Sequence, residues 1–452
     1  MNYQDRLLAA IPGGSHTYSR GFDQYPSNAP QILTRGKGAY VFDDANNKFL
    51  DYGMALRAVN LGYSEEEIDL SAIKQIQNGN NLTRPSMIEL EAAELMIDLI
   101  DSVDMVKFTK NGSSAVSAAV KLSRAYTGRD LVARCSDHPF FSYDDWFIAS
   151  TPVTLGIPKD VLEKTKLFKY NDIRSLEELI ERFPNKIACV VIEAATIDCP
   201  ALYKDEVGCC QDSPCSRPYN TSVNNYLQQV QAVCNKNGIV FILDEMITGF
   251  RWNLKGAQHM YGVRPDLSTF GKAMANGYSV ACLAGKRDIM KLGSIELAGQ
   301  ERVFLLSTTH GAEMSGLGAF VATVKFISEN NVIDHLWNYG KKLSNMIQQQ
   351  AKAHGVEHSF KIVGPACSPH YLTVDPSNEA SLGLRTLFSQ EMISKGVLMP
   401  WIALSYRHGE RELEITEEAI DSAFRIYKKA LDDGYENFLL GSVIKPVFRT
   451  HN

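Results

Sequence analysis

Short apolar runs alternate along the middle of the chain with segments that have helical spacing. The runs are rich in β-branched residues and cover Ala188–Ile192, Gly238–Leu243 and Val280–Ala284. Helical spacing is found over Ser175–Arg182 and Ser222–Asn235. Continuous apolar strands that alternate with helices are typical of parallel strands buried on both faces. The pattern therefore predicts an α/β domain built on a large, mostly parallel sheet.

The two ends of the chain have a different pattern. Residues 316–330 predict a long helix that leads out of the α/β domain, and the remainder mixes helices with short strands such as Tyr371–Val374. Near the N-terminus, Pro12-Gly13-Gly14 is followed by a strand pair with a turn at Asp43–Asn47. We therefore expect an N-terminal segment that packs on the other domains (1–50), a large α/β domain (51–315) and a small C-terminal α+β domain (316–452).

Composition and charge narrow the classes of protein that fit. Hydrophobic residues make up 45% and charged residues 22% of the 452 residues, as in globular proteins. The net charge of -6 argues against nucleic acid as a main partner, because phosphate backbones select basic surfaces. No run of about 18 apolar residues is present, so we expect no membrane partner. The N-terminus lacks the basic start and apolar run of a signal peptide, and we expect a cytoplasmic protein.

Nine cysteines are present, and five of them stand apart from one another. Several of these five lie in apolar runs, where a cysteine is usually a small buried hydrophobe. The other four lie in a loop rich in Gly, Pro and Asp: Cys199, Cys209, Cys210 and Cys215. The loop contains no histidine and does not have two clean C-x-x-C pairs, so we expect an ordinary inserted loop and no metal.

Two candidate catalytic residues follow from the strand pattern. Asp244 directly follows the apolar run that ends at Leu243, and ligands of open parallel sheets bind outside the carboxyl ends of strands. A carboxylate there could hold a proton on a ligand's ring nitrogen, although an Asp that caps the next turn is equally common. Lys272 lies among small and apolar neighbours, where desolvation would lower its pKa and favour Schiff-base chemistry. Taken alone, a lysine is usually a solvated surface charge.

Two further segments are candidates for phosphate binding. Lys110-Asn111-Gly112-Ser113-Ser114 precedes a helix-like run from Val116 to Thr127, and N–H groups at a helix start bind phosphate. A simple Ser cap on that helix would explain the same pattern. Ser307-Thr308-Thr309-His310-Gly311 precedes another long helix and could add a hydroxyl. Together, a reactive lysine, a carboxylate for a pyridinium nitrogen and a phosphate cup describe a site for pyridoxal 5'-phosphate (PLP), which works as an electron sink.

These motifs resemble the class III family of PLP-dependent aminotransferases, and within it the glutamate-1-semialdehyde 2,1-aminomutase-like branch. The resemblance covers nearly the whole chain. Its clearest motifs are Ile11–Gly14 with Arg20, Tyr126–Asp130, Asp244–Arg251, Phe270–Met274, Ala284–Met290 and Ile415–Ile420. It implies the PLP-dependent transferase fold type I, an aspartate aminotransferase-like α/β architecture, and a homodimer with shared active sites.

The resemblance also implies roles for individual residues. Lys272 would form the Schiff base with PLP and carry the proton, and Asp244 would pair with the pyridine nitrogen. Arg20 matches a substrate-carboxylate arginine, a task that suits the bidentate guanidinium, and Arg57 lies in a segment expected near the substrate. The implied cofactor contacts are Asn111, Gly112 and Ser113 at the phosphate, Phe140 stacked on the ring, Glu193 and Asp198 as polar neighbours, and Thr308 reaching the phosphate of the neighbouring subunit's cofactor.

Three departures from the family pattern bear on the reaction. Phe141 stands where the family has a histidine, so the substrate side of the site differs. Ser113-Ser114 replaces the usual Thr-Glu at the phosphate loop. The Gly-rich gating loop of the aminomutases corresponds to Ser150–Thr154, which lacks glycine, and an aminomutase must enclose its diamino intermediate until the second amine transfer.

The favoured hypothesis is therefore a PLP-dependent transaminase. It would move an amino group from an amino donor, with glutamate as the first candidate, to a ketone or aldehyde of a polar small molecule, with a sugar as one candidate. The first alternative is a glutamate-1-semialdehyde 2,1-aminomutase, and a second is racemisation or epimerisation through the same carbanion chemistry. An alternative of another class is a PLP-binding homologue that has lost turnover.

Overall fold

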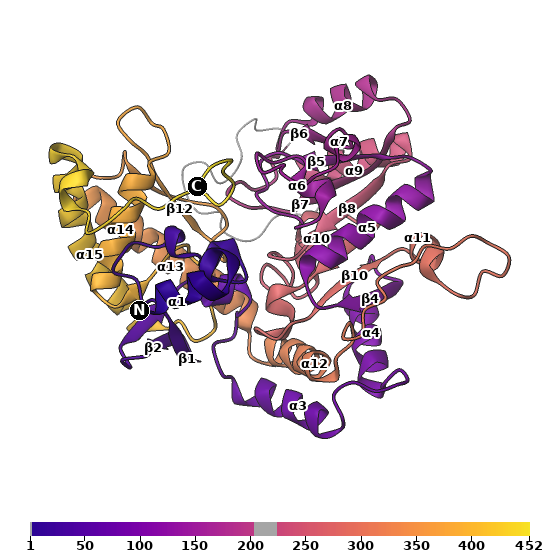
Figure 1. The fold of residues 1–452 in the computed structure, drawn as a ribbon, viewed down its shortest axis with the longest axis horizontal. Coiled ribbons are helices and arrows are strands. Elements are labelled where there is room, and N and C mark those ends of the chain that lie inside the picture. Colours follow the sequence, from indigo (N-terminus) through magenta and orange to yellow (C-terminus); the bar gives the residue numbers. More distant parts are fainter. Residues whose placement is uncertain (1, 203–223) are drawn as a thin grey trace. The chain divides into compact units, whose positions relative to one another are not determined.

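The fold is described from a computed structural model, which describes residues 2–202 and 224–452 (Figure 1). The chain divides into two compact units. Within the described ranges, the smaller unit comprises residues 2–65 and 334–449, and the larger unit comprises 66–202, 224–333 and 450–452. Cys209, Cys210 and Cys215 of the expected inserted loop lie outside the described residues. The division into domains at residues 50 and 315 stays a prediction.

The larger unit is built on a seven-stranded sheet with the order β4-β10-β9-β8-β7-β5-β6. All neighbouring strands are parallel except β10, which is antiparallel to both β4 and β9. Every residue of β7 and β8 is buried, which confirms that these apolar runs form interior strands. The strands are β4 (Met105–Thr109), β5 (Leu131–Cys135), β6 (Thr165–Phe168), β7 (Ile187–Glu193), β8 (Val240–Asp244), β9 (Leu267–Phe270) and β10 (Ala281–Gly285).

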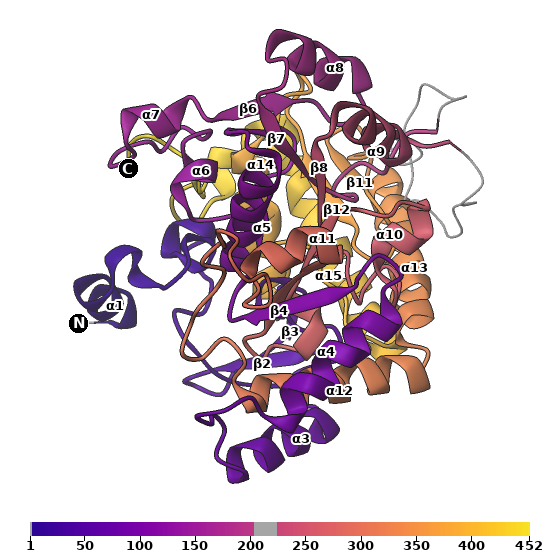
Figure 2. The same cartoon turned by 90° about the vertical axis from the view of Figure 1, so that its right-hand side faces the viewer.

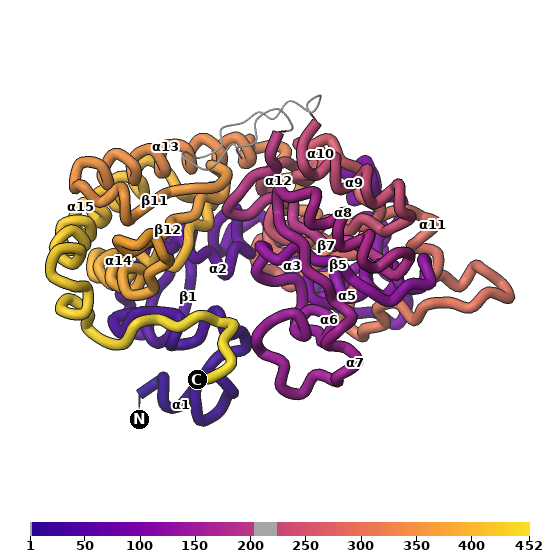
Figure 3. The backbone as a smooth tube through the Cα atoms, turned by 90° about the horizontal axis from the view of Figure 1, so that it is seen from above, coloured from indigo at the N-terminus to yellow at the C-terminus, as the bar shows by residue number. Residues whose placement is uncertain are grey.

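Helices cover this sheet on both sides. Figure 3 shows α9 and α10 on one side of β5 and β7, with α5 on the other. In Figure 2, α3, α4 and α12 lie side by side below the sheet, and α12 contacts both of the others. The helices are α3 (Glu66–Gln77), α4 (Met87–Leu99), α5 (Gly112–Thr127), α6 (Asp145–Ile148), α7 (Lys159–Leu162), α8 (Ile173–Arg182), α9 (Tyr226–Asn237), α10 (Gly256–Tyr261), α11 (Arg287–Met290) and α12 (Met314–Glu329), with 3-10 turns η4 (Lys272–Ala275) and η5 (Lys291–Gly293). The predicted α/β fold is thus confirmed.

The smaller unit joins both ends of the chain in one sheet of order β1-β2-β3-β13. The turn between β2 and β3 forms at the predicted place, where the Asp43 carboxylate accepts the Asn47 N–H at 2.7 Å. Strands β11 and β12 pair separately, and α14 packs on both α15 and β12. The elements are β1 (Leu33–Lys37), β2 (Tyr40–Asp43), β3 (Lys48–Asp51), β11 (Phe360–Val363), β12 (His370–Thr373), β13 (Val397–Leu398), α1 (Tyr3–Ala10), α2 (Met54–Arg57), α13 (Val332–Ala353), α14 (Leu382–Ser394), α15 (Glu410–Asp433), η1 (Pro12–Gly14), η2 (Tyr18–Arg20), η3 (Phe22–Gln24) and η6 (Tyr435–Phe438).

Three findings concern the described residues of both units. Of the helices that the structure describes, none combines the length and the apolar character that a membrane span requires. The five isolated cysteines are buried, as expected for small hydrophobes: Cys135, Cys189, Cys234, Cys282 and Cys367. Cys199, which was expected in the inserted loop, is buried as well. Residues 2–202 and 224–452 contain no group of three or more His, Cys, Asp or Glu side chains arranged to hold a metal ion.

Candidate active site

The ends of three neighbouring strands bring polar side chains together at the carboxyl edge of the large sheet. Glu193 pairs in register with Asp244, and Asp244 with Thr269. The carboxylate of Asp244 accepts the Met246 N–H at 2.9 Å and the Thr269 hydroxyl at 3.1 Å. Asp244 is only 3% exposed, so these contacts fix its orientation in the interior.

Lys272 lies close enough to Asp244 for the two charges to interact. It follows β9 directly after Gly271 and is half-buried. Its backbone has a positive φ of 46°, which residues other than glycine rarely adopt. Burial raises the pKa of the Asp244 carboxyl to about 6, and the positive charge of Lys272 is the main influence that lowers it. The charge of Lys272 thus lies near enough to a buried carboxylate at the sheet edge to lower its pKa.

Met246 is the point at which the phosphate-loop motif and the lysine motif meet. A Cβ on Gly112 would lie 2.7 Å from the Met246 sulfur, and a Cβ on Gly271 would lie 2.6 Å from it. Met246 also packs with Ala115 and Ala281 in one buried cluster. The absence of side chains at Gly112 and Gly271 therefore allows the start of α5 to approach the backbone that precedes Lys272.

The start of α5 has the features of an anion-binding helix end. Asn111 caps the helix, since its side-chain oxygen accepts the Ser114 N–H at 2.9 Å. The other N–H groups of a first helical turn have no acceptor within the helix. Ser113 is buried, and its hydroxyl accepts the Tyr143 N–H at 3.2 Å. The helix is 16 residues long, so its dipole adds to the attraction for a phosphate.

The two phenylalanines after β5 have different surroundings. Phe140 is 47% exposed and contacts Phe147 edge-on, with 5.6 Å between ring centroids, so one ring face remains accessible to a ligand. Phe141 is 2% exposed and packs against His138 and Phe147. Phe141 therefore belongs to the core beneath the loop, whereas Phe140 has the exposure that a stacking residue needs.

His138 and Thr269 were missed in the sequence analysis. The Nδ1 atom of His138 accepts the Glu193 N–H at 3.0 Å, which ties the loop after β5 to the end of β7. Burial lowers the pKa of His138 to about 3, so the imidazole is neutral. Thr269 could have been found from register, because it is the residue of the next strand that faces Asp244. No local pattern marks His138.

The remaining predicted cofactor residues of the larger unit lie in separate places. Glu193 is 3% exposed at the end of β7 and next to Asp244. Asp198 is exposed in the loop that follows, where its carbonyl accepts the Thr196 N–H at 3.2 Å. Thr308 is exposed in the loop before α12, where its carbonyl accepts the Gly311 N–H. The cofactor contacts of Asp198 and Thr308 stay predictions.

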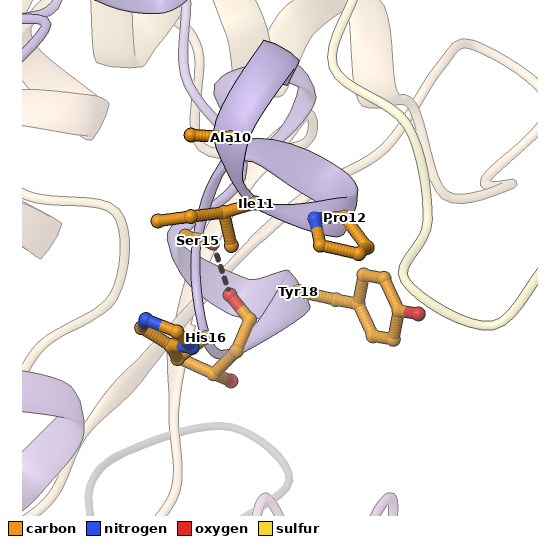
Figure 4. A pocket seen from close by; sticks show the side chains of 7 residues that line it. Ala10, Ile11, Pro12, Ser15, His16 and Tyr18 are labelled. Atoms are coloured by element: carbon orange, nitrogen blue, oxygen red, sulfur yellow. Dashed lines mark hydrogen bonds between the residues drawn. The ribbon is translucent and has the colours of Figure 1, made fainter. Parts of the chain in front are cut away.

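The two predicted substrate arginines belong to the smaller unit. Arg20 is exposed on η2, and Arg57 is half-buried at the end of α2. A hollow of about 320 Å³ also occurs in this unit, formed by residues 10–12 and 15–18 (Figure 4). The Ser15 hydroxyl donates to the Thr17 carbonyl at 2.7 Å beside it. Its lining includes neither arginine, so we assign it no role in the site.

The residues gathered at the sheet edge fit PLP by the chemistry of their side chains. Lys272 supplies an amine for the aldehyde, Asp244 a buried carboxylate for the ring nitrogen, and the start of α5 a group of N–H donors for the phosphate. The approach of Gly112 and Gly271 to Met246 brings all three into one region.

Comparison with known proteins decides the family. The model of the family described as aminotransferase class-III matches residues 23–201 and 215–431. The chain belongs to this family. A 3-aminobutyryl-CoA aminotransferase of Cloacimonas acidaminovorans is 31% identical over 441 residues, which cover 95% of this chain and 98% of the relative. A glutamate-1-semialdehyde 2,1-aminomutase of Francisella philomiragia is 26% identical over 442 residues, which cover 94% and 96%.

Solved structures share the fold. The PLP internal aldimine form of the FumI protein from Sphingopyxis sp. MTA144 has a TM-score of 0.82 at 24% identity and covers 97% of this chain and 99% of its own. An omega-transaminase from Sphaerobacter thermophilus has a TM-score of 0.79 at 23% identity, with 94% and 97% covered. These likenesses confirm the predicted fold type. The match to the class III family confirms the predicted family, PLP cofactor and transaminase class of enzyme.

Proposed function

We propose that this class III enzyme is an aminotransferase that uses an amino donor, with glutamate as the first candidate, and a ketone or aldehyde acceptor on a polar small molecule, for example a sugar. The observation that carries the proposal is the approach of Gly112, at the start of α5, and of Gly271, which precedes Lys272, to the same Met246 side chain, two residues after the buried Asp244. PLP supplies the electron sink that stabilises charge at the substrate Cα. We also propose a cytoplasmic homodimer.

The chain's own residues would divide the work as follows. Asp244, oriented by Thr269 and the Met246 N–H, holds a proton on the ring nitrogen, where burial strengthens the attraction between opposite charges. The amine of Lys272 would accept the proton released from the substrate Cα and give it back during the transfer of the amino group. Ser113 and the Gly112 N–H anchor the phosphate. Arg20 and Arg57 bind the substrate carboxylate.

The segment that corresponds to the aminomutase gate favours an aminotransferase. Arg134, which is 5% exposed, donates to the Ser150 hydroxyl at 2.7 Å and to the Ser150 carbonyl at 2.9 Å. The Thr151 hydroxyl donates to the Ile148 carbonyl at 2.8 Å. A segment anchored in this way suits an enzyme that releases its first product before the second substrate binds. The relative that is 31% identical is also named as an aminotransferase.

The test is spectroscopic. PLP bound to the purified protein should give the visible band of a lysine-bound cofactor, and L-glutamate should bleach it as the amino group is transferred. Lys272→Ala should abolish both the band and turnover. Lys286→Ala is the matched control, because Lys286 is an exposed lysine paired with Asp266 and should leave both unchanged. A Lys272→Ala protein that keeps the lysine-bound band would refute the assignment of Lys272.

The aminomutase remains the second candidate, because a relative of similar coverage carries that name. Glutamate-1-semialdehyde would then be converted to 5-aminolevulinate by the enzyme loaded with pyridoxamine phosphate, with no separate donor. An aminotransferase should instead need a donor and an acceptor and give one product from each. Product analysis with the semialdehyde alone therefore separates the two candidates.

A further inference from the structure

The turn that carries Thr308 is exposed at its tip and held by close contacts at its base. Residues 308–311, called here the Thr308 turn, are closed by the Gly311 N–H, which donates to the Thr308 carbonyl at 3.2 Å. Gly311 is buried, and a Cβ on it would lie 2.6 Å from the Thr308 hydroxyl and 3.3 Å from the Phe108 carbonyl of β4. The position of the Thr308 hydroxyl therefore depends on the missing side chain at residue 311.

Two asparagines in the connection between α3 and α4 hold the same segment from another side. The Asn81 amide donates to the Thr309 carbonyl at 3.1 Å. The backbone carbonyl of Asn80 accepts the Met314 N–H at 2.8 Å, and its side-chain oxygen accepts the Ser315 N–H at 3.0 Å. Asn80 thus caps the start of α12, while Asn81 fixes the turn that precedes it.

Glu313 stands at the N-cap position of α12, but its carboxylate has partners outside that helix. A side chain at this position commonly accepts N–H groups of its own helix. The Glu313 carboxylate instead accepts the Asn80 amide at 2.8 Å and forms an ion pair with Lys110. The hydrogen bond from Lys110 lowers the pKa of Glu313, and the Asn80 amide and the charge of His310 lower it further. Glu313 is therefore ionised at neutral pH.

Lys110 connects this ion pair to the phosphate cup of its own subunit. It directly precedes Asn111, the residue that caps α5. The Lys110 carbonyl accepts the Ser279 hydroxyl at 2.6 Å, so its backbone is held as well as its side chain. The Lys110–Glu313 pair therefore joins the start of α5 to the segment that carries the Thr308 turn.

We propose that Glu313 is a positioning residue for Thr308, and that the Lys110–Glu313 pair sets the Thr308 turn in the shape that binds the phosphate of the neighbouring subunit's cofactor. This inference rests on the PLP-dependent homodimer proposed above and names the residue on which its shared site depends. The carboxylate of Glu313 would repel a phosphate, so its effect passes through the turn. An exposed turn that is ordered in advance binds more tightly, because it loses less conformational freedom on binding.

The first experiment follows the loss of PLP from the loaded protein by the decay of the lysine-bound band during dialysis. Thr308→Ala and Glu313→Ala should each speed the loss by about 10-fold, as expected for a hydrogen bond to a charged group. The double variant should lose PLP no faster than Thr308→Ala, because both changes remove the same contact. Glu329→Ala, at the exposed last residue of α12, is the matched control and should leave the rate unchanged. Fully additive losses in the double variant would overturn the inference.

Pyridoxal separates a phosphate contact from general damage to the fold. It lacks the phosphate but can form the same Schiff base with Lys272. Glu313→Ala should keep the rate of pyridoxal loss within about 2-fold of the wild type. Gly311→Ala should behave in the same way, with faster loss of PLP alone, because its methyl group displaces the Thr308 hydroxyl. Equal acceleration of PLP and pyridoxal loss in Glu313→Ala would show a merely structural role and overturn the inference.

Mixed dimers show whether the effect crosses to the partner. Co-expression of two differently tagged chains, one with Lys272→Ala, gives a dimer in which the lysine-bound band reports the other subunit alone. Glu313→Ala in the Lys272→Ala chain should speed PLP loss from the intact site by about 10-fold. Glu313→Ala in the chain with the intact Lys272 should change that rate by less than about 2-fold. The reverse pattern, or a wild type that forms no dimer, would overturn the inference.

These measurements need neither an amino donor nor an acceptor, so they separate the inference from the proposed function. An active aminotransferase with the reverse pattern in its mixed dimers would overturn the inference alone. A dimer with the expected pattern that transfers no amino group between any donor and acceptor would overturn the proposed function alone.

Discussion

Asp244 and Glu245 are adjacent carboxylates whose surroundings give them different tasks. Glu245 is fully buried and accepts the Ala257 N–H at 2.9 Å and the Gln258 N–H at 2.8 Å, which ties the end of β8 to α10. Asp244 accepts fewer hydrogen bonds and interacts with the charge of Lys272. Glu245 therefore supports the fold, whereas Asp244 remains available for a cationic partner.

The raised pKa of Asp244 makes the stability of the cofactor-free protein depend on pH. Burial raises the pKa of the Asp244 carboxyl to about 6, above its value in an unfolded chain. Its contribution to the free energy of unfolding is therefore fully present below pH 4 and is lost as the pH rises through 6. Asp244→Asn removes this loss. In urea unfolding without PLP, the free energy of unfolding of the variant, relative to that of the wild type, should rise by about 2–3 kcal/mol between pH 4 and pH 7. With PLP, the wild type should gain more stability at pH 7 than the variant.

Asp130→Asn is the control for this pH effect. The hydrogen bond from Lys164 lowers the pKa of this exposed carboxyl, so its contribution has the opposite sign. The free energy of unfolding of Asp130→Asn, relative to that of the wild type, should therefore not rise with pH. A constant difference between Asp244→Asn and the wild type from pH 4 to pH 7 would contradict the role of burial at Asp244.

At the scale of elements, the interior strands and the site helix could be predicted because their signals are local. Continuous apolar runs give β7 and β8, and Asn111 before an Ala-rich segment gives α5. The antiparallel direction of β10 could not be predicted, because strand order depends on pairing with β4, more than 170 residues earlier. The left-handed turn of α2 could not be predicted either, because none of its four residues is glycine. Hydrogen bonds with Asp51 and Trp401 hold the start of this turn, and Trp401 is distant in sequence.

The candidate site shows the same division between local and long-range information. Asp244 follows its strand, and Lys272 lies among small neighbours, so both could be found from the sequence. Their proximity follows from the register of β8 and β9. His138 lies 55 residues before the Glu193 N–H that it accepts, and His370 lies 313 residues after Arg57. Contacts over such separations depend on the complete fold and leave no local pattern.

The segment after α6 gives a prediction at this scale. Arg134→Met removes the hydrogen bonds from its guanidinium to Ser150 and the bond to the Cys135 carbonyl at 2.9 Å. Losing charged donors to buried acceptors should lower the free energy of unfolding by about 2–4 kcal/mol. Tryptic cleavage after Lys159 should become faster, because the segment before it is released. Arg182→Met, at an arginine beside Phe183, should change neither measurement.

For the whole molecule, the surface of the larger unit supports the proposed dimer. Apolar side chains are exposed at one helical spacing along α3, with Leu70 57%, Ile73 45% and Ile76 53% exposed. More follow towards and within α4, where Leu82, Met87 and Leu90 are each more than half exposed. Contiguous exposed apolar residues mark association surfaces. The exposed Thr308 would face the phosphate of the partner's cofactor in the dimer that the resemblance implies.

Ile73→Glu tests whether this surface joins two subunits and whether the cofactor depends on the junction. Burying a carboxylate against a second apolar α3 is strongly unfavourable, so sedimentation at micromolar concentration should show the wild type at twice the mass of the variant. If Thr308 reaches across the interface, the monomer should also lose PLP faster on dialysis, and Thr308→Ala should weaken PLP retention in a protein that remains dimeric. Leu162→Glu, at a partly exposed apolar residue of α7, should alter neither property. A dimeric Ile73→Glu protein would place the interface elsewhere, whereas a monomer with undiminished PLP retention would confine the cofactor site to one subunit.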